Sequence, residues 1–124
     1  MTKNQRKFIR SLHQKKRREQ EGLFLVEGAK NVLELLQTPR FDVTALFATS
    51  AFQEQNATLL SEYSPITASP SDLQQAGTFR SNDRALALVR IPAQTPPPTL
   101  KGFVLALDGI SDPGNLGTIL RIAD

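Results

Sequence analysis

The sequence predicts an α/β layer fold, in which helices cover a largely parallel or mixed sheet. Segments with helical spacing alternate with short apolar runs, in the order α-β-α-β-α-β-α-β. The chain has 124 residues, of which 40% are hydrophobic and 22% charged, an ordinary composition for a globular domain with a core. A proline-rich segment then separates this alternation from one further apolar run.

The first expected element is a helix over residues 3 to about 18. At 100° per residue, Phe8, Ile9 and Leu12 form one apolar stripe. The cations on the opposite side of this helix are Lys3, Arg6, Lys7, Arg10 and Arg17. One side is therefore expected to pack, while the other presents positive charge.

The following elements are predicted from apolar runs and from their breakers. Residues 23–26 are consecutively apolar and predict a buried strand, which Gly28 ends. The helix of Val32 to Leu36 ends before Pro39. The remaining expected elements are a strand at 43–48, a helix from about 51 to 62, a short strand at 65–68, a helix through Gln75 with Ser71 as its N-cap and Gly77 beyond its end, and a strand at 85–91.

The segment 92–102 (PAQTPPPTLKG) contains four of the eight prolines and predicts a stiff linker. The expected organisation is one domain at 1–91, the linker, and a strand, loop and helix at 103–124. The strand is expected at 103–107 (FVLAL) and the helix over the last residues to Asp124. A lone strand cannot bury both faces, so 103–124 is interpreted as the start of a truncated second domain.

Charge is concentrated at the N-terminus. Residues 1–21 contain eight Lys or Arg and two Glu, a net charge of +6, whereas the other 103 residues carry −3. This predicts that a polyanion docks there, although a solvated helix face is the alternative. No cysteine and no apolar run long enough to span a bilayer are present, and we expect a cytoplasmic protein.

Five spaced residues near the C-terminal end suggest a site: Asp108, Pro113, Asn115, Gly117 and Arg121. Either Asp112 or Asn115 can cap the helix, whose N-terminus would follow a buried strand, where α/β sheets place ligands. Arg121 points about 150° away from the apolar stripe, one turn beyond Gly117. Considered alone, the pattern also fits a common turn followed by a solvated arginine.

These five residues resemble motif 1 of the SpoU (TrmH-like) family of RNA 2′-O-ribose methyltransferases in the SPOUT superfamily. The pattern of that motif is Asp, then Pro-x-Asn-x-Gly-x-x-x-Arg. The segment KFIRSLHQKKRREQEGLFLVEGAKNVLELL is similar to the start of the family's N-terminal substrate-binding domain. The residues that carry this second similarity are Lys16, Arg18, Phe24, Glu27, Gly28 and Val32.

The resemblance implies methyl transfer from S-adenosylmethionine to a ribose 2′-hydroxyl. It implies that Arg121 takes the hydroxyl proton and that Asn115 shapes the site beside it. A guanidinium is a poor base, so positioning the phosphate or acidifying the hydroxyl is an equally physical role for Arg121. The family binds its cofactor and dimerises in a C-terminal trefoil knot, whose later motifs do not occur before Asp124. We expect this chain to be inactive and monomeric alone, with no cofactor-binding residues.

The resemblance also implies an α/β/α sandwich like that of the kink-turn-binding ribosomal proteins, with RNA, most readily ribosomal RNA, as partner and transfer RNA as the alternative. The cations expected to contact RNA are Lys7, Arg10, Lys15, Lys16, Arg17 and Arg18. Glu27 is assigned first a structural role and second an RNA contact. Base stacking is not indicated by the aromatic residues, and His13 has no partner at metal-ligand spacing. A non-catalytic RNA-binding module remains the alternative function.

Overall fold

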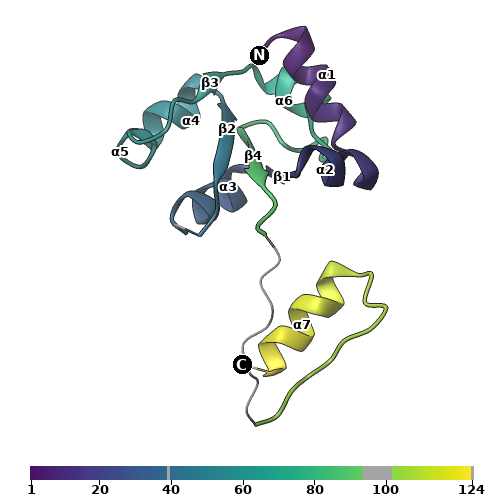
Figure 1. The fold of residues 1–124 in the computed structure, drawn as a ribbon. Coiled ribbons are helices and arrows are strands. Elements are labelled where there is room, and N and C mark those ends of the chain that lie inside the picture. Colours follow the sequence, from purple (N-terminus) through teal and green to yellow (C-terminus); the bar gives the residue numbers. More distant parts are fainter. Residues whose placement is uncertain (39, 94–101, 124) are drawn as a thin grey trace. The chain divides into compact units, whose positions relative to one another are not determined.

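A computed structural model describes residues 1–38, 40–93 and 102–123, which belong to two compact units, 1–93 and 94–124 (Figure 1). The first unit contains a four-stranded sheet. Its strands, β1 (Leu23–Glu27), β2 (Val43–Ala48), β3 (Ile66–Thr67) and β4 (Ala85–Arg90), lie in the order β1-β4-β2-β3. β4 is antiparallel to β1 and β2, while β2 and β3 are parallel. The expected mixed sheet is confirmed.

Helices cover both faces of this sheet. One face packs against α3 (Ala29–Leu36), α4 (Ser50–Gln55) and α5 (Ala57–Leu60). The opposite face packs against α1 (Lys3–Ser11) and α6 (Pro70–Ala76), and α2 (Lys15–Glu21) lies beside β1 (Figure 1). The unit is therefore an α/β/α sandwich, as the family resemblance implied.

β4 explains why the strands appear in the sequence as continuous apolar runs. Ala85, Ala87 and Val89 belong to the core under α3, α4 and α5, whereas Leu86 and Leu88 belong to the core under α1 and α6. Side chains alternate between the faces of a strand, so a central strand covered on both faces must be apolar at every position.

Two predicted helices are each divided in the structure. The helix expected over residues 3 to about 18 is wrong, because α1 ends at Ser11 and α2 begins at Lys15. Arg18 Nη1 donates to the carbonyls of Leu12 and His13 at 3.0 and 2.9 Å. In a continuous helix these carbonyls would accept backbone N–H groups four residues later, so the arginine takes the place of the helical bonds.

The helix expected at about 51–62 is interrupted at Asn56, which has φ −124° and ψ 25°. Its side-chain Nδ2 donates to the carbonyl of Phe52 at 2.8 Å, the group that its backbone N–H would reach in a helix. The N-cap assignment to Ser71 is also wrong: Ser69 Oγ accepts from the backbone N–H of Asp72, and Pro70 occupies the first turn. Proline suits that position because its missing N–H would have no helical partner.

The second unit contains one described helix, α7 (Pro113–Ala123). Asp112 Oδ1 accepts from the backbone N–H groups of Gly114 and Asn115 at 2.6 and 3.0 Å, so Asp112 is the cap. The strand predicted at 103–107 is wrong in this structure: these residues form no strand and are exposed. Within the described part of the chain they have no neighbouring strand to pair with. Most of the predicted linker, residues 94–101, lies outside the described residues.

Candidate nucleic-acid interface

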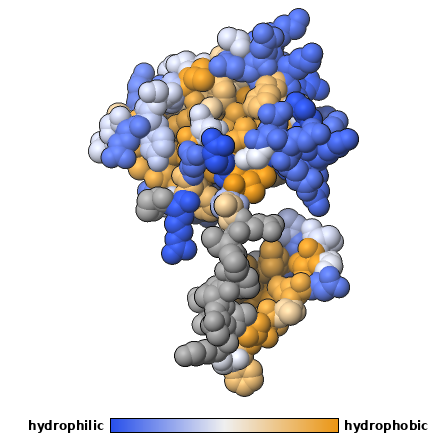
Figure 2. Space-filling model, viewed as in Figure 1, coloured by the Kyte–Doolittle hydropathy of each residue, from blue (hydrophilic) through white to orange (hydrophobic). Residues whose placement is uncertain are grey.

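α1 presents a basic hollow beside α6. Lys3, Lys7 and Arg10 are exposed, and with Asn4, Arg6 and Gln75 they line a hollow of about 590 Å³. In Figure 2 hydrophilic side chains gather over α1 and α2. Such a concave arrangement of cations raises the local potential and attracts phosphates.

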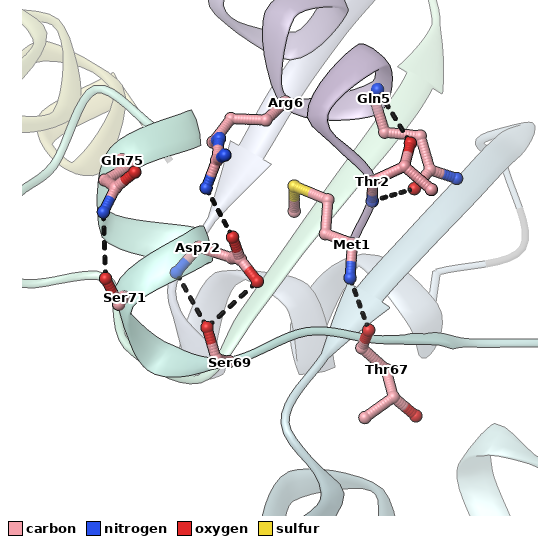
Figure 3. Close-up of polar contacts among 9 residues, drawn as sticks. All are labelled: Met1, Thr2, Gln5, Arg6, Thr67, Ser69, Ser71, Asp72 and Gln75. Carbon is pink, nitrogen blue, oxygen red and sulfur yellow. Dashed lines mark hydrogen bonds and ion pairs between the residues drawn. The ribbon is translucent and has the colours of Figure 1, made fainter.

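Polar contacts fix α1 in place against β3 and α6 (Figure 3). Arg6 Nη1 pairs with Asp72 Oδ1 at 2.6 Å. The Met1 amino group donates to the Thr67 carbonyl at 2.9 Å, and the Thr2 side chain caps α1 in a capping box with Gln5. Arg6 therefore anchors the helix, which leaves the other cations of the hollow at defined positions.

The six cations predicted to contact RNA differ in their surroundings. Lys15 pairs with Glu19 at 3.7 Å and Arg17 with Glu21 at 2.9 Å, both one helical turn apart on α2. Three cations of this set are exposed and have no acidic partner among the described residues: Lys7, Arg10 and Lys16. The structure brings Arg17 next to the Lys7 side of α1, since both line a second hollow of about 300 Å³.

Arg18 is a special member of the set. Its Nη1 stabilises the Leu12–Gln14 break, as described above, and the residue is half-buried. His13, beside it in this break, approaches the Ala76 carbonyl with Nε2 at 2.8 Å. The break therefore joins α1, α2 and the C-terminal end of α6, and Arg18 has a structural role besides any contact with RNA.

Glu27 is 6% exposed, and its carboxylate accepts four hydrogen bonds. The backbone N–H of Thr78 donates to Oε1 and Oε2 at 3.0 and 2.9 Å, and the Thr78 hydroxyl donates to Oε1 at 2.6 Å. The backbone N–H of Phe79 donates to Oε2 at 3.2 Å. This geometry supports the structural interpretation of Glu27, which ties the loop after α6 to the end of β1.

Phe79 and Arg80, in the loop before β4, were missed by the sequence reasoning. Phe79 is 59% exposed although its backbone is held by Glu27, and Arg80 is exposed next to it. An aromatic residue followed by arginine in a segment rich in Gly, Ser, Asn and Asp was the available signal. Without the Glu27 contact, that signal could not be separated from an ordinary surface loop.

Asn115 and Arg121 are both exposed on α7. They are six positions apart, which corresponds to about 9 Å along the helix axis and 120° around it. Among the described residues, neither side chain makes a hydrogen bond or an ion pair. A Cβ on Gly117, one turn before Arg121, would meet no atom within 4 Å, so the space next to the arginine is open.

Two kinds of feature are absent from the described residues. No helix in the described ranges is long and apolar enough to cross a bilayer. Nor do those residues bring together three or more His, Asp or Glu side chains in a group that could hold a metal ion.

A three-layer α/β/α unit with a basic hollow on one helix has the features of a polyanion-binding domain. The chain belongs to the family of the MRM3-like substrate binding domain, whose model matches residues 3–87. The comparisons that follow confirm the resemblance to SpoU/TrmH-family methyltransferases.

Two curated relatives match almost the whole chain. An uncharacterised tRNA/rRNA methyltransferase of Synechocystis sp. is 32% identical over 123 residues, covering 94% of this chain and 44% of the relative. The 23S rRNA (guanosine(2553)-2′-O)-methyltransferase RlmP of Bacillus subtilis is 31% identical over 131 residues, covering 98% of this chain and 48% of RlmP. The chain thus spans less than half the length of each of these relatives.

Solved structures share the fold. A Porphyromonas gingivalis protein assigned to the TrmH family of RNA methyltransferases matches with a TM-score of 0.78 and 38% identity, covering 100% of this chain and 48% of that one. An RNA 2′-O ribose methyltransferase matches with a TM-score of 0.67 at 23% identity, covering 99% of this chain and 49% of that one, a likeness of fold alone.

Proposed function

We propose that the protein to which this chain belongs transfers a methyl group from S-adenosylmethionine to a ribose 2′-hydroxyl of ribosomal RNA in the cytoplasm. The observation that carries the proposal is the match of residues 3–87 to a substrate-binding domain, in a chain whose relatives include RNA methyltransferases. These relatives favour an enzyme over a non-catalytic RNA-binding module. Transfer RNA is the competing substrate.

The proposed roles follow the domain boundaries expected from the sequence. Residues 1–91 bind the substrate RNA, 92–102 link this domain to the next, and 103–124 begin the catalytic domain, whose knot would form a homodimer. The basic hollow of α1 supports the first assignment, because Lys7 and Arg10 are exposed there beside an ion pair that holds the helix.

Arg121 and Asn115 are proposed to serve the reaction from α7. S-adenosylmethionine would supply an electrophilic methyl group, and Arg121 would either accept the 2′-hydroxyl proton or hold the neighbouring phosphate. The family resemblance supports a cofactor site built from later motifs of the knot, which this sequence does not contain.

RNA binding is tested by charge reversal on α1. Lys7→Glu and Arg10→Glu should each weaken binding of the 124-residue chain to a ribosomal RNA fragment and reduce the slope of log K against log salt by about 0.7, the value for one phosphate contact on a single strand. The matched control is Arg40→Glu, the same charge change at another exposed position. Equal effects of Lys7→Glu and Arg40→Glu would remove the hollow from the proposal.

Methyl transfer is tested in the full-length protein with radiolabelled S-adenosylmethionine. Ribosomal and transfer RNA are offered separately, and labelled nucleotides are analysed for 2′-O-methylation. Arg121→Ala should abolish transfer with little change in cofactor affinity, and Arg121→Lys should restore part of it only if the charge positions the phosphate. Full activity of Arg121→Ala would refute its role.

A further inference from the structure

A further pocket, lined by both apolar and polar side chains, lies between the Leu12–Gln14 break, the outer side of β1 and the loop after α6. Its volume is about 450 Å³, within the range of small-molecule sites. Its apolar wall includes Leu12, Phe24 and Val26, whereas its polar lining includes Arg18 and Asn31. Phe79 also lines the pocket. This combination of an aromatic ring, an apolar wall and a few polar groups is suited to a flat, partly polar ligand.

Phe79 is exposed but not loosely attached. Its backbone N–H and both donors of Thr78 bind the buried Glu27 carboxylate. Gly77 makes this approach possible, since a Cβ there would overlap Glu27 Oε2. The fold thus uses the buried Glu27 carboxylate to fix the backbone of Phe79, a residue that remains 59% exposed. Because this backbone is already ordered, only side-chain freedom is lost when a partner stacks on the ring.

The polar groups of the pocket have unused capacity. Asn31 donates with Nδ2 to the Glu27 carbonyl at 2.9 Å, and its Oδ1 can act as an acceptor. Arg18 uses Nη1 for the Leu12 and His13 carbonyls, and its remaining N–H groups can meet an anion. The pocket therefore offers one acceptor for a base edge and one cation for a phosphate.

α2 contributes a cation both to this pocket and to the basic surface. Arg18 lines the pocket, and its neighbour Arg17 lines the hollow that contains Lys7. A cation at each of these two hollows favours RNA over an apolar peptide as the occupant.

We propose that this pocket takes one unpaired nucleobase of the substrate RNA. The base stacks on Phe79, offers an N–H to Asn31 Oδ1, and places an adjacent phosphate near Arg18. The inference rests on the proposed RNA-binding function and deepens it: α1 would hold the backbone without regard to sequence, and the pocket would select single-stranded over paired RNA.

The test compares two RNA probes: a hairpin with a loop of unpaired adenosines, and a duplex of the same length. Phe79→Leu in the 124-residue chain should weaken hairpin binding about tenfold, as expected for one lost stacking contact. Its duplex affinity should change less than twofold and its salt slope should stay as in the wild type, because no charge is altered. Phe103→Leu, at an exposed phenylalanine of the second unit, is the matched control and should leave both affinities unchanged.

A reporter variant makes the result independent of affinity. The chain contains no tryptophan, so Phe79→Trp introduces one fluorophore, which the hairpin should quench and the duplex should not. Equal behaviour of Phe79→Leu and Phe103→Leu, or equal loss for hairpin and duplex, would overturn the pocket assignment while RNA binding stands. Failure of the wild type to bind either probe would instead overturn the proposed function.

Discussion

Gly77 and Glu27 should be energetically coupled. The backbone of Gly77, with φ −78° and ψ 177°, is one that alanine adopts freely, so Gly77→Ala carries no backbone strain. The new methyl group would however overlap Glu27 Oε2 and lie 3.2 Å from the Leu73 carbonyl. Overpacking of this kind costs about 1–3 kcal/mol, against a gain of about 0.4–1 kcal/mol from a stiffer unfolded chain.

The coupling appears when the carboxylate is removed. Glu27→Ala alone should lower the free energy of unfolding by roughly 2–4 kcal/mol. Thr78 and Phe79 lose hydrogen bonds to a buried charge, each worth about 1.5–3 kcal/mol, and hydration of the freed donors offsets part of this loss. In that background the overlap is gone, and Gly77→Ala should be neutral or slightly stabilising. We therefore expect an interaction free energy of about 1–3 kcal/mol in the double-mutant cycle.

Urea unfolding of the four proteins, followed by circular dichroism, measures this coupling. With an m-value of about 1–2 kcal/mol per M, a loss of 2 kcal/mol lowers the midpoint by about 1–2 M. Glu34→Gln, which disturbs only an exposed pair with Lys30 at 3.9 Å, is the control and should change stability by less than about 0.5 kcal/mol. An equal cost of Gly77→Ala with and without Glu27 would refute the reasoning.

Three further outcomes are expected. Arg18→Met should lower the free energy of unfolding by about 1–3 kcal/mol, because two carbonyls lose a charged donor, whereas Arg17→Met, which removes a partly exposed pair, should cost under about 1 kcal/mol. Asp112→Ala removes the cap of α7 and should destabilise its first turn by about 1 kcal/mol, seen as faster amide exchange at Gly114 and Asn115 with no change in residues 1–93. Calorimetric titration of the 124-residue chain with S-adenosylmethionine should show no heat of specific binding. One-to-one binding would contradict our placement of the cofactor site.

The alternation of helices and strands could be predicted because it depends on local composition. The strand predicted at 43–48 has the same bounds as β2. The strand predicted at 85–91 corresponds to β4 (Ala85–Arg90), an apolar run that is covered on both faces. The breaks at Leu12–Gln14 and Asn56 could not be predicted in the same way. Each depends on a side chain that takes a backbone carbonyl from the helix, and helical periodicity continues through such a point unchanged.

Long-range contacts account for the rest. Glu27 and Thr78 are 51 positions apart, so no spacing rule connects them, and Phe79 acquires its significance only through that contact. The apolar run at 103–107 has the pattern of a buried strand. A buried strand requires neighbouring strands to pair with, and the described residues supply none for this run. Asn115 and Arg121 stay predictions for a related reason, since among the described residues neither side chain has a hydrogen-bond or ion-pair partner.

The ion pairs of α2 determine how many phosphates the basic surface can hold. If the pairs of Lys15 with Glu19 and Arg17 with Glu21 persist in the complex and Arg18 remains at the helix break, only Lys7, Arg10 and Lys16 contact RNA. The slope of log K against log salt is then about −2 for a single strand; with all six cations it is about −4. Exposed pairs one helical turn apart contribute only about 0.3–0.5 kcal/mol, which a phosphate can replace, so we expect a slope near −4 for RNA that crosses both helices. A slope near −2 that Glu19→Gln and Glu21→Gln together make steeper would show instead that the pairs hold these cations back from RNA.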